Sequence, residues 1–320
     1  MRTIWLRTRL MLLVALMFAI LFGLFSAIGY LTLGSSQLFI YFSLFLSFFL
    51  LFIQYAIGPK MVDWSMRVKY VSETEYPRLH SIVDELARSA NIPKPKVGIS
   101  QIAIPNAFAY GRTKKDARVC VTAELLNRLD EEELKAVLAH EISHVKHRDM
   151  LVITMLSVIP MICYHIFLSL LWSGGGSREN KGGAAAIGIL AFLLYFVTNL
   201  LVLYASRIRE YYADAGSVEL TGKKHTLASA LYKIVYGSAK YSKEQLKPVE
   251  GMRAFFASDP DTARRDLSDL RSADINLDGR IDEYEMEAFA RDAKVSKTDR
   301  LLEIFSTHPA LVKRIKALAS

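Results

Sequence analysis

Two histidines and a glutamate near the middle of the chain have the spacing of a zinc site. His140 and His144 are four residues apart, so on a helix both imidazoles project from one face and can reach one tetrahedral ion. Glu141 cannot easily ligate that ion, but it can reach a water molecule held by it. Zinc lowers the pKa of such a water to about 7, and a carboxylate beside it can accept the proton. The segment 140–144 therefore predicts hydrolytic chemistry.

The residues before this segment predict the helix that the zinc chemistry requires. Asp130 followed by Glu133 is the pattern of a capping box, which begins a helix. A motif with three fixed positions also arises by chance, and the alternative is two unrelated histidines. Against that alternative, an apolar stripe at helical spacing continues into the segment. The stripe consists of Leu134, Val137, Leu138, Ile142 and Val145.

A catalytic zinc ion needs a third protein ligand and one open position for water. His147 is disfavoured because three ligands on one straight helix are strung along its axis. Glu210 is favoured because it lies on a second predicted helix, where Arg207 and Asp214 share its face. Asp214 could then accept the other ring N–H of a ligand histidine. The alternative is a solvated charged helix face. All candidates for the third ligand are His147, Asp149, Glu210, His225 and His308.

These segments, taken in order, resemble a known family. They are similar to the HtpX-type integral membrane zinc endopeptidases, which are related to the CaaX prenyl endopeptidases. The resemblance covers nearly the whole chain except residues 259–293. It implies a gluzincin fold, zinc held by His140, His144 and Glu210, a catalytic Glu141, and Asp214, Asp149 and Arg207 behind the ligands. The matching motifs are His140-Glu141-x-x-His144 with Asp149, Ser206-Arg207-x-x-Glu210-x-x-x-Asp214, and Thr307-His308-Pro309 with Arg314.

Two further segments gain a role from the resemblance. His308 is implied to lie near the site, where it could donate a hydrogen bond to an oxyanion; a packing role is the equal alternative. Alternation and composition predict strands at 97–102, 108–111 and 118–122, after an amphipathic helix at 75–90. A short sheet beside a zinc helix can bind a peptide by strand addition, although an ordinary edge strand is the alternative. The implied substrate-facing residues are Asn106, Ala107, Phe108 and Ala109.

Residues 259–293 depart from the family pattern. The segment Asp274–Glu285 fits a complete EF-hand calcium loop, with Gly279 at the tight turn. Helices are predicted on both sides, at 262–271 and 284–293. EF-hands generally pair and no second loop is visible, so weak binding is expected, and a solvated acidic turn is the alternative. The candidate calcium ligands are Asp274, Asn276, Asp278, Arg280 through its carbonyl, Asp282 and Glu285.

Four apolar runs are near the length of about 20 residues that crosses a bilayer. The first follows three arginines but is too long for a cleaved signal peptide, so we interpret it as an anchor. Buried core helices are the alternative for the last two. The runs lie at about 10–33, 38–57, 151–172 and 186–204.

Lysine and arginine lie on one side of these runs. They precede the first run and follow the second and the fourth, whereas the loop at 173–185 carries few of them. The positive-inside rule therefore places both termini and the catalytic segments in the cytoplasm. We expect a multi-pass protein of the cell inner or plasma membrane with its zinc site on the cytoplasmic face.

The predicted fold class is an α-helical membrane protein with a cytoplasmic α+β protease domain of gluzincin type. Its two cysteines, Cys120 and Cys163, are too few for a disulfide framework. The expected segments are 1–57 with two spans, 58–150 with the sheet and zinc helix, 151–205 with two spans, 206–258 with the third ligand, 259–293 with the calcium loop, and 294–320 with the His-Pro motif.

We expect a zinc endopeptidase that hydrolyses membrane or misfolded proteins, with the bilayer and these substrates as partners and calcium as a candidate second ion. The net charge of +8 follows the positive-inside pattern without a basic aromatic stripe, so no nucleic acid is expected. The glycines at 173–177 lack the Gly-Lys-Ser/Thr ending of a phosphate loop, so no ATP site is expected. The alternatives are a calcium-responsive membrane scaffold with a degenerate hydrolase fold, and a prenyl-protein protease.

Overall fold

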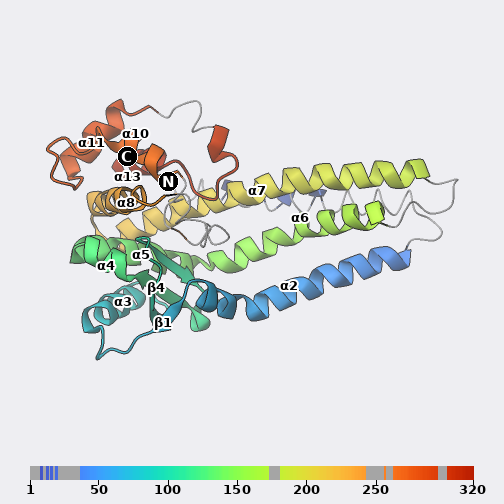
Figure 1. Ribbon diagram of the computed structural model, residues 1–320, viewed down its shortest axis with the longest axis horizontal. Helices are drawn as coiled ribbons and strands as arrows, with labels where there is room; N and C mark the ends of the chain where they lie inside the picture. Colours follow the sequence, from blue (N-terminus) through green and yellow to red (C-terminus); the bar gives the residue numbers. More distant parts are fainter. Residues whose placement is uncertain are drawn as a thin grey trace. The chain divides into compact units, whose positions relative to one another are not determined.

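The chain divides into two compact units, residues 1–57 with 151–208 and residues 58–150 with 209–320, which are described separately. Figure 1 shows the elements in a computed structural model. The predicted membrane run at 10–33 falls almost wholly outside the described residues. These are 37–172, 181–242, 256, 262–294 and 301–320, with a few positions between 8 and 20.

The first unit consists of long apolar helices. The predicted runs after the first lie on α2 (Gln37–Ser65), α6 (Asp149–Trp172) and α7 (Lys181–Thr221). Within the described residues, two helical stretches are long and apolar enough to cross a membrane, Asp149–Leu168 and Ala185–Thr221. Length and composition of this kind are what a bilayer core selects.

The packing of the first unit leaves much of this apolar surface uncovered. Ile159, Cys163 and Ala191 are buried in one cluster between the helices. Ile189 and Leu193 on α7 are nevertheless 63% and 55% exposed. Contiguous exposed apolar surface of this kind is typical of a membrane or protein contact.

The second unit contains a four-stranded sheet with the order β1-β2-β4-β3. The central strands β2 and β4 are parallel, and the two outer strands are antiparallel to their neighbours. All five residues of β4 are buried, as expected for the β-branched run of a central strand. The strands are β1 (Val68–Tyr70), β2 (Lys96–Ser100), β3 (Ala107–Tyr110) and β4 (Arg118–Thr122).

Helix α5 (Glu131–His147) carries the histidine motif and begins with the predicted capping box. The Asp130 side chain accepts the Glu133 N–H at 2.9 Å, and Glu133 accepts the Asp130 N–H at 3.0 Å. These bonds satisfy donors that the first turn of a helix leaves free. Arg148 then adopts a left-handed conformation with φ of 58°, which separates α5 from α6.

The remaining helices of the second unit surround α5. α3 (Pro77–Ser89) occupies the predicted helix at 75–90 and buries its apolar face, including Val83 and Leu86. α8 (Lys224–Ser238) packs against α5 and is buried on most of its surface. The others are η1 (Lys114–Asp116), α4 (Ala123–Arg128), α10 (Ala263–Leu270), α11 (Glu283–Asp292) and α13 (Leu311–Ala319).

Residues 262–294 belong to the core of this unit and are not an appendage. Ala273, Ile281, Met286 and Phe289 are at most 4% exposed and share a hydrophobic cluster with α5, α8 and α13. Helices α10 and α11 flank the Asp274–Glu285 loop as the calcium-loop pattern predicts. The loop is therefore mechanically connected to the helices that carry the histidine motif and the C-terminal residues.

Candidate metal centre

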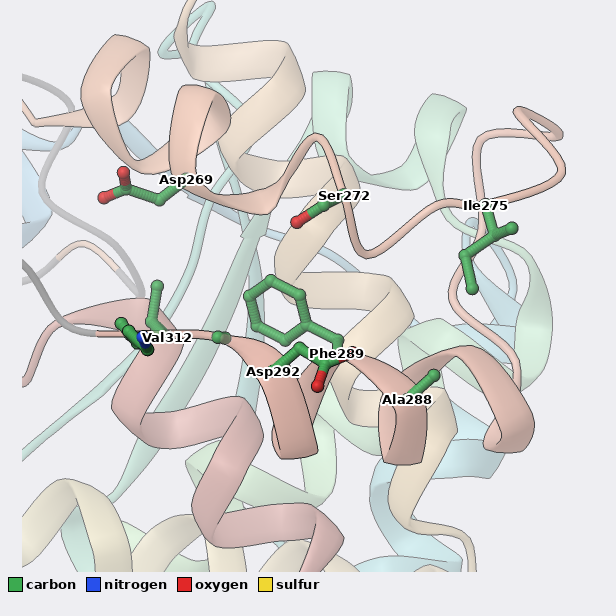
Figure 2. A pocket seen from close by; sticks show the side chains of 9 residues that line it. Asp269, Ser272, Ile275, Ala288, Phe289, Asp292 and Val312 are labelled. Atoms are coloured by element: carbon green, nitrogen blue, oxygen red, sulfur yellow. The ribbon is translucent and has the colours of Figure 1, made fainter.

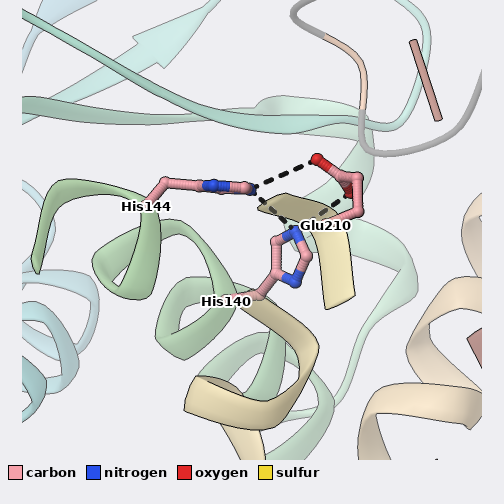
Figure 3. A group of neighbouring side chains, drawn as sticks. All are labelled: His140, His144 and Glu210. Carbon is pink, nitrogen blue, oxygen red and sulfur yellow. Dashed lines mark hydrogen bonds and ion pairs between the residues drawn. The ribbon is translucent and has the colours of Figure 1, made fainter. Parts of the chain in front are cut away.

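The structure brings His140, His144 and Glu210 together, as Figure 3 shows. The two Nε2 atoms lie 3.1 Å apart, and they lie 3.5 Å and 3.4 Å from the two oxygens of the Glu210 carboxylate. Ligand atoms about 2.0–2.1 Å from a tetrahedral zinc ion lie about 3.3 Å from one another. The three side chains therefore fit zinc, and they are the one group of at least three metal-binding side chains found in the described residues.

The close approach of α7 to α5 places Glu210 beside the histidines. Gly216 on α7 faces Ser143 on α5, and a Cβ added there would collide with the serine side chain. One residue further, Ser217 donates a hydrogen bond of 2.7 Å to the Ala136 carbonyl of α5. A larger residue at position 216 would separate the two helices and with them the ligands.

A carboxylate lies behind each histidine. Asp214 is 3.0 Å from His140 Nδ1, and Asp149 is 2.7 Å from His144 Nδ1. A ring nitrogen that faces a carboxylate holds the proton, so each Nε2 presents its lone pair toward the other ring. Two lone pairs facing each other at 3.1 Å favour a cation between them.

A buried arginine holds each of these carboxylates. Arg314 of α13 is 1% exposed and binds Asp214 with hydrogen bonds of 3.0 and 2.6 Å. Its third nitrogen is 3.3 Å from Glu210, and these anions raise the pKa of Arg314 although burial opposes the shift. Arg209 pairs with Asp149 and also donates to the His147 carbonyl at 3.0 Å. The arginines neutralise the carboxylates and fix their orientation.

The acidic surroundings also act on the two histidines. Burial alone would lower the pKa of His140, but the nearby carboxylates of Asp214 and Glu210 outweigh burial and raise it. The pKa of His144 is raised in the same way, with Glu210 as the largest opposing influence. The centre therefore attracts positive charge to the space between the rings.

Glu141 is almost completely buried, with 4% of its surface exposed. Burial raises its pKa, while His144 and His140 pull the pKa down. Its carboxylate also accepts a hydrogen bond from the Ala109 N–H of β3. This links the motif on α5 directly to the outer strand of the sheet.

His308 lies beside the centre but outside the three-ligand group. Its Nε2 is 3.9 Å from Glu210, and its Nδ1 is 2.9 Å from the Thr307 hydroxyl. His147 lies against Ser143 at 3.2 Å, and its pKa is lowered to about 4 by burial and by Arg209. Neither His147 nor His225 joins the group of metal-binding side chains found in the described residues.

The residues predicted to face the substrate are the first three residues of β3 and Asn106 directly before it. Ala107 and Phe108 are at most 2% exposed, and the Asn106 N–H donates to the Thr122 hydroxyl at 2.9 Å. Ala109 is partly exposed. A peptide added to this strand would therefore meet its backbone more than its side chains.

Sequence reasoning did not assign the two arginines that hold the carboxylates. The Arg207 guanidinium lies over the Tyr204 ring at 5.7 Å, and the role behind the ligands that the sequence predicts for Arg207 stays a prediction. Arg209 occupies the place against Asp149. Arg314 was part of the family pattern without a role. Arg314 could have been recognised from its place in the apolar stripe of α13, because an arginine buried with such a stripe needs an acidic partner.

Residues 73–320 match peptidase family M48. The chain belongs to peptidase family M48. It is 54% identical over 231 residues to "Protease HtpX homolog" of Methanothermobacter thermautotrophicus, covering 72% of this chain and 86% of that protein. It is 39% identical over 255 residues to "Protease HtpX homolog 2" of Methanosarcina mazei, covering 79% of this chain and 85% of that protein. The family and enzyme class predicted from the motifs are thereby confirmed.

A solved structure, the crystal structure of S. mikatae Ste24p, shares the fold. The TM-score is 0.56 at 17% sequence identity, covering 98% of this chain. The chain spans only 65% of the length of that protein, so the likeness concerns architecture alone. Together, the family and the apolar helices make this M48 protein a membrane metalloprotease, and its family implies a metal, typically zinc.

Proposed function

We propose that His140, His144 and Glu210 hold one zinc ion and that Glu141 is the general base of peptide hydrolysis. The supporting observation is three ligand atoms at tetrahedral spacing beside a buried carboxylate. A zinc ion held there would act as a Lewis acid and lower the pKa of a bound water to about 7. Glu141 accepts the proton and returns it to the leaving amine. The Ala109 N–H orients the Glu141 carboxylate for both transfers.

His308 is proposed to stabilise the developing oxyanion. Its Nε2 lies 3.9 Å from a Glu210 oxygen, and Thr307 engages the opposite ring nitrogen at 2.9 Å. The Thr307 hydroxyl can accept a hydrogen bond from a protonated Nδ1 or donate one to an unprotonated Nδ1. In a neutral ring, the second arrangement leaves the proton on Nε2. A tautomer or imidazolium with a proton on Nε2 can donate toward the reacting carbonyl, where one such donor typically contributes about 10²–10³-fold in rate.

The proposed substrates are membrane and misfolded proteins, bound in extended form along β3. β3 is the last strand of the sheet, and its Ala109 already contacts Glu141, so a peptide added there would pass the base. We also propose four membrane spans with both termini and the centre on the cytoplasmic side, as the lysine and arginine pattern favours.

Replacement of Glu141 by glutamine tests the mechanism. Glu141→Gln is expected to retain zinc while peptide cleavage falls about 10²–10⁴-fold, because the ligands are spared and the base is lost. The matched control is Glu132→Gln on the same helix, whose side chain is 62% exposed and pairs with Lys223. Zinc is measured by metal analysis and cleavage with an unstructured protein substrate. Full activity in zinc-loaded Glu141→Gln would refute the assignment.

Replacement of the ligands tests the metal assignment separately. His140→Ala, His144→Ala and Glu210→Ala are each expected to reduce bound zinc. His147→Ala is expected to retain it, because His147 lies against Ser143 and Tyr212. Loss of zinc in His147→Ala but not in Glu210→Ala would show that the third ligand is wrong.

We further propose calcium as a second cation of this protein, held by the Asp274–Glu285 loop. The spacing of oxygen-bearing residues in the loop supports this.

A further inference from the structure

The Asp274–Glu285 loop is held by hydrogen bonds between its own side chains and its own backbone. At each of four ligand positions, one side-chain oxygen accepts a backbone N–H from later in the loop, at 2.7–3.0 Å. Such bonds fix the side chains and leave further lone pairs free for a cation. The bonds run to Asp274 from Gly279, to Asn276 from Asp278, to Asp278 from Arg280, and to Asp282 from Glu285.

One carboxylate oxygen of Asp274 is buried without a hydrogen-bond partner among the described residues. The residue is 4% exposed, and its Oδ2 accepts bonds from Gly279 and from the Tyr232 hydroxyl at 3.2 Å. Its Oδ1 is buried without a hydrogen-bond partner among the described residues. An unsatisfied buried oxygen of a carboxylate is costly, and a divalent cation at the first loop position would satisfy it.

Glu285, at the last loop position, closes the loop by itself. It is 3% exposed, and its Oε1 accepts the N–H groups of Ile275 and Asn276 at 2.8 and 3.1 Å. Its Oε2 accepts the Asp282 N–H at 3.0 Å. Both lone pairs of Oε1 are therefore used, so Glu285 must turn if both of its oxygens are to ligate one ion. Because Glu285 lies in the first turn of α11, this turn would shift the start of that helix.

There is room for α11 to move. A cavity of about 340 Å³ lies between α10, α11, the loop and α13, and Figure 2 shows its walls. Asp269 comes from α10, Ile275 from the loop, Phe289 and Asp292 from α11, and Val312 from α13. A helix that borders a cavity can change its angle without disrupting a filled core.

The first path from the loop to the zinc centre runs through α13. Met286 and Phe289 of α11 share a cluster with Ile315 of α13, and Lys316 donates to the Ala293 carbonyl at 2.8 Å. α13 also carries Arg314, which holds Asp214 and Glu210. A shift of α11 therefore reaches the arginine that orients one ligand and the carboxylate behind another.

The second path runs through the start of the zinc helix. The Ile281 N–H of the loop donates to Ser229 at 3.3 Å, and Ser229 donates to Glu133 at 2.8 Å. Glu133 belongs to the capping box of α5 and pairs with Lys233 at 2.7 Å. Arg280 of the loop also lies 3.4 Å from Asp130, the other half of that capping box. The loop thus contacts Asp130 directly and Glu133 through Ser229, and these are the two residues of the capping box of α5.

We propose that the Asp274–Glu285 loop binds one calcium ion through oxygen ligands, and that its occupancy stabilises the zinc centre through Arg314 and the Asp130–Glu133 cap. Calcium is favoured over magnesium because it accepts about six to eight oxygens in a variable geometry, whereas magnesium requires a near-ideal octahedron. A single loop without a partner should bind at the weak end, about 10⁻⁴–10⁻³ M. Binding stands independently, whereas the coupling rests on the proposed zinc site.

Terbium luminescence on the full-length protein in detergent tests binding, with Tyr284 within the loop as sensitiser. Calcium is expected to displace terbium at sub-millimolar to millimolar concentration, and magnesium far less well. Glu285→Gln keeps one oxygen that can accept the Ile275 and Asn276 N–H groups, loses the acceptor of the Asp282 N–H and removes a charge, and should weaken calcium binding about tenfold or more. Asp278→Asn, at an exposed position, should do the same. Glu283→Gln is the matched control, because Glu283 is acidic, adjacent and not a loop ligand, and it should bind normally.

The rate of zinc release to a chelating dye tests the coupling. Calcium is expected to slow zinc release in the wild type and in Glu283→Gln, and not in Glu285→Gln. Identical release rates with and without calcium would overturn the coupling, and equal terbium signals in wild type and Glu285→Gln would overturn the calcium site. Absence of peptidase activity with both metal readouts intact would count instead against the proposed function.

Discussion

At the residue scale, the two histidines proposed as zinc ligands are held by similar but unequal sets of contacts. The side chains of His140 and Asp214 are each 4% exposed, whereas the side chain of His144 is 18% exposed. Each carboxylate has its own arginine, but Arg209 lies on the helix that carries Glu210 and Arg314 comes from α13. Hydrogen bonds behind a metal ligand raise its basicity and fix its ring, so both arrangements should matter for metal affinity.

Removal of Asp149 tests whether the carboxylate behind His144 contributes to zinc affinity. Asp149→Ala frees the His144 ring and is expected to weaken zinc about 10–100-fold. It also leaves Arg209 buried without its anion, so the protein should be less stable to heat. Asp116→Ala is the matched control, because Asp116 pairs with Arg112 and Arg118 in the same unit away from the ligands. Unchanged zinc affinity in Asp149→Ala, measured by competition with a chelator, would contradict the prediction.

The pH dependence of cleavage follows from the burial of Glu141. Below its pKa Glu141 is protonated and cannot accept a proton, so activity should fall as the pH decreases. Because burial raises that pKa, the fall should occur above the value of about 4.3 that is ordinary for glutamate. The measurement is kcat/KM against pH, with zinc content determined at each point to separate loss of the base from loss of the metal. Full activity down to the ordinary glutamate range would contradict the assignment.

At the element scale, the contact between Gly216 and Ser143 sets how near α7 comes to α5. Gly216→Ala is expected to weaken zinc binding, because the new Cβ would lie 2.7 Å from the Ser143 Cβ. Ser143→Gly removes both clashing atoms and leaves the nearest one, Ser143 Cα, at 3.9 Å. The double variant should therefore recover zinc affinity, at a cost of about 1 kcal/mol for a helical glycine. Failure of Ser143→Gly to improve Gly216→Ala would show that the contact does not set the helix spacing.

Helices and strands whose apolar residues recur at a regular spacing could be predicted from the sequence, and those without such a spacing could not. α3 and the start of α5 followed from an amphipathic stripe and a capping box. α8 was not predicted because it is buried on nearly all sides and shows no polar face. β1 has only three residues, too few for an alternation to be recognised. Arg209 could not be assigned because its partner, Asp149, is distant in sequence and meets it only in the folded unit.

At the scale of the whole molecule, the distribution of lysine and arginine predicts on which side of the membrane each segment lies. Cysteines introduced as Ser177→Cys and Ser320→Cys should react with a membrane-impermeant thiol reagent from opposite sides. Ser177 lies in the loop between the third and fourth apolar runs, which carries few basic residues, and Ser320 ends the basic C-terminal segment. In intact cells only the first should be labelled, and permeabilised cells should label both.

The native cysteines leave this experiment nearly free of background. Cys120 and Cys163 are both buried, and burial raises the pKa of the Cys120 thiol to about 12, so little reactive thiolate forms at neutral pH. The unsubstituted protein is therefore the control. Labelling of both introduced cysteines from outside would reverse the orientation of the C-terminal segment. It would also move the proposed zinc centre, which that segment completes through Arg314, to the outer face.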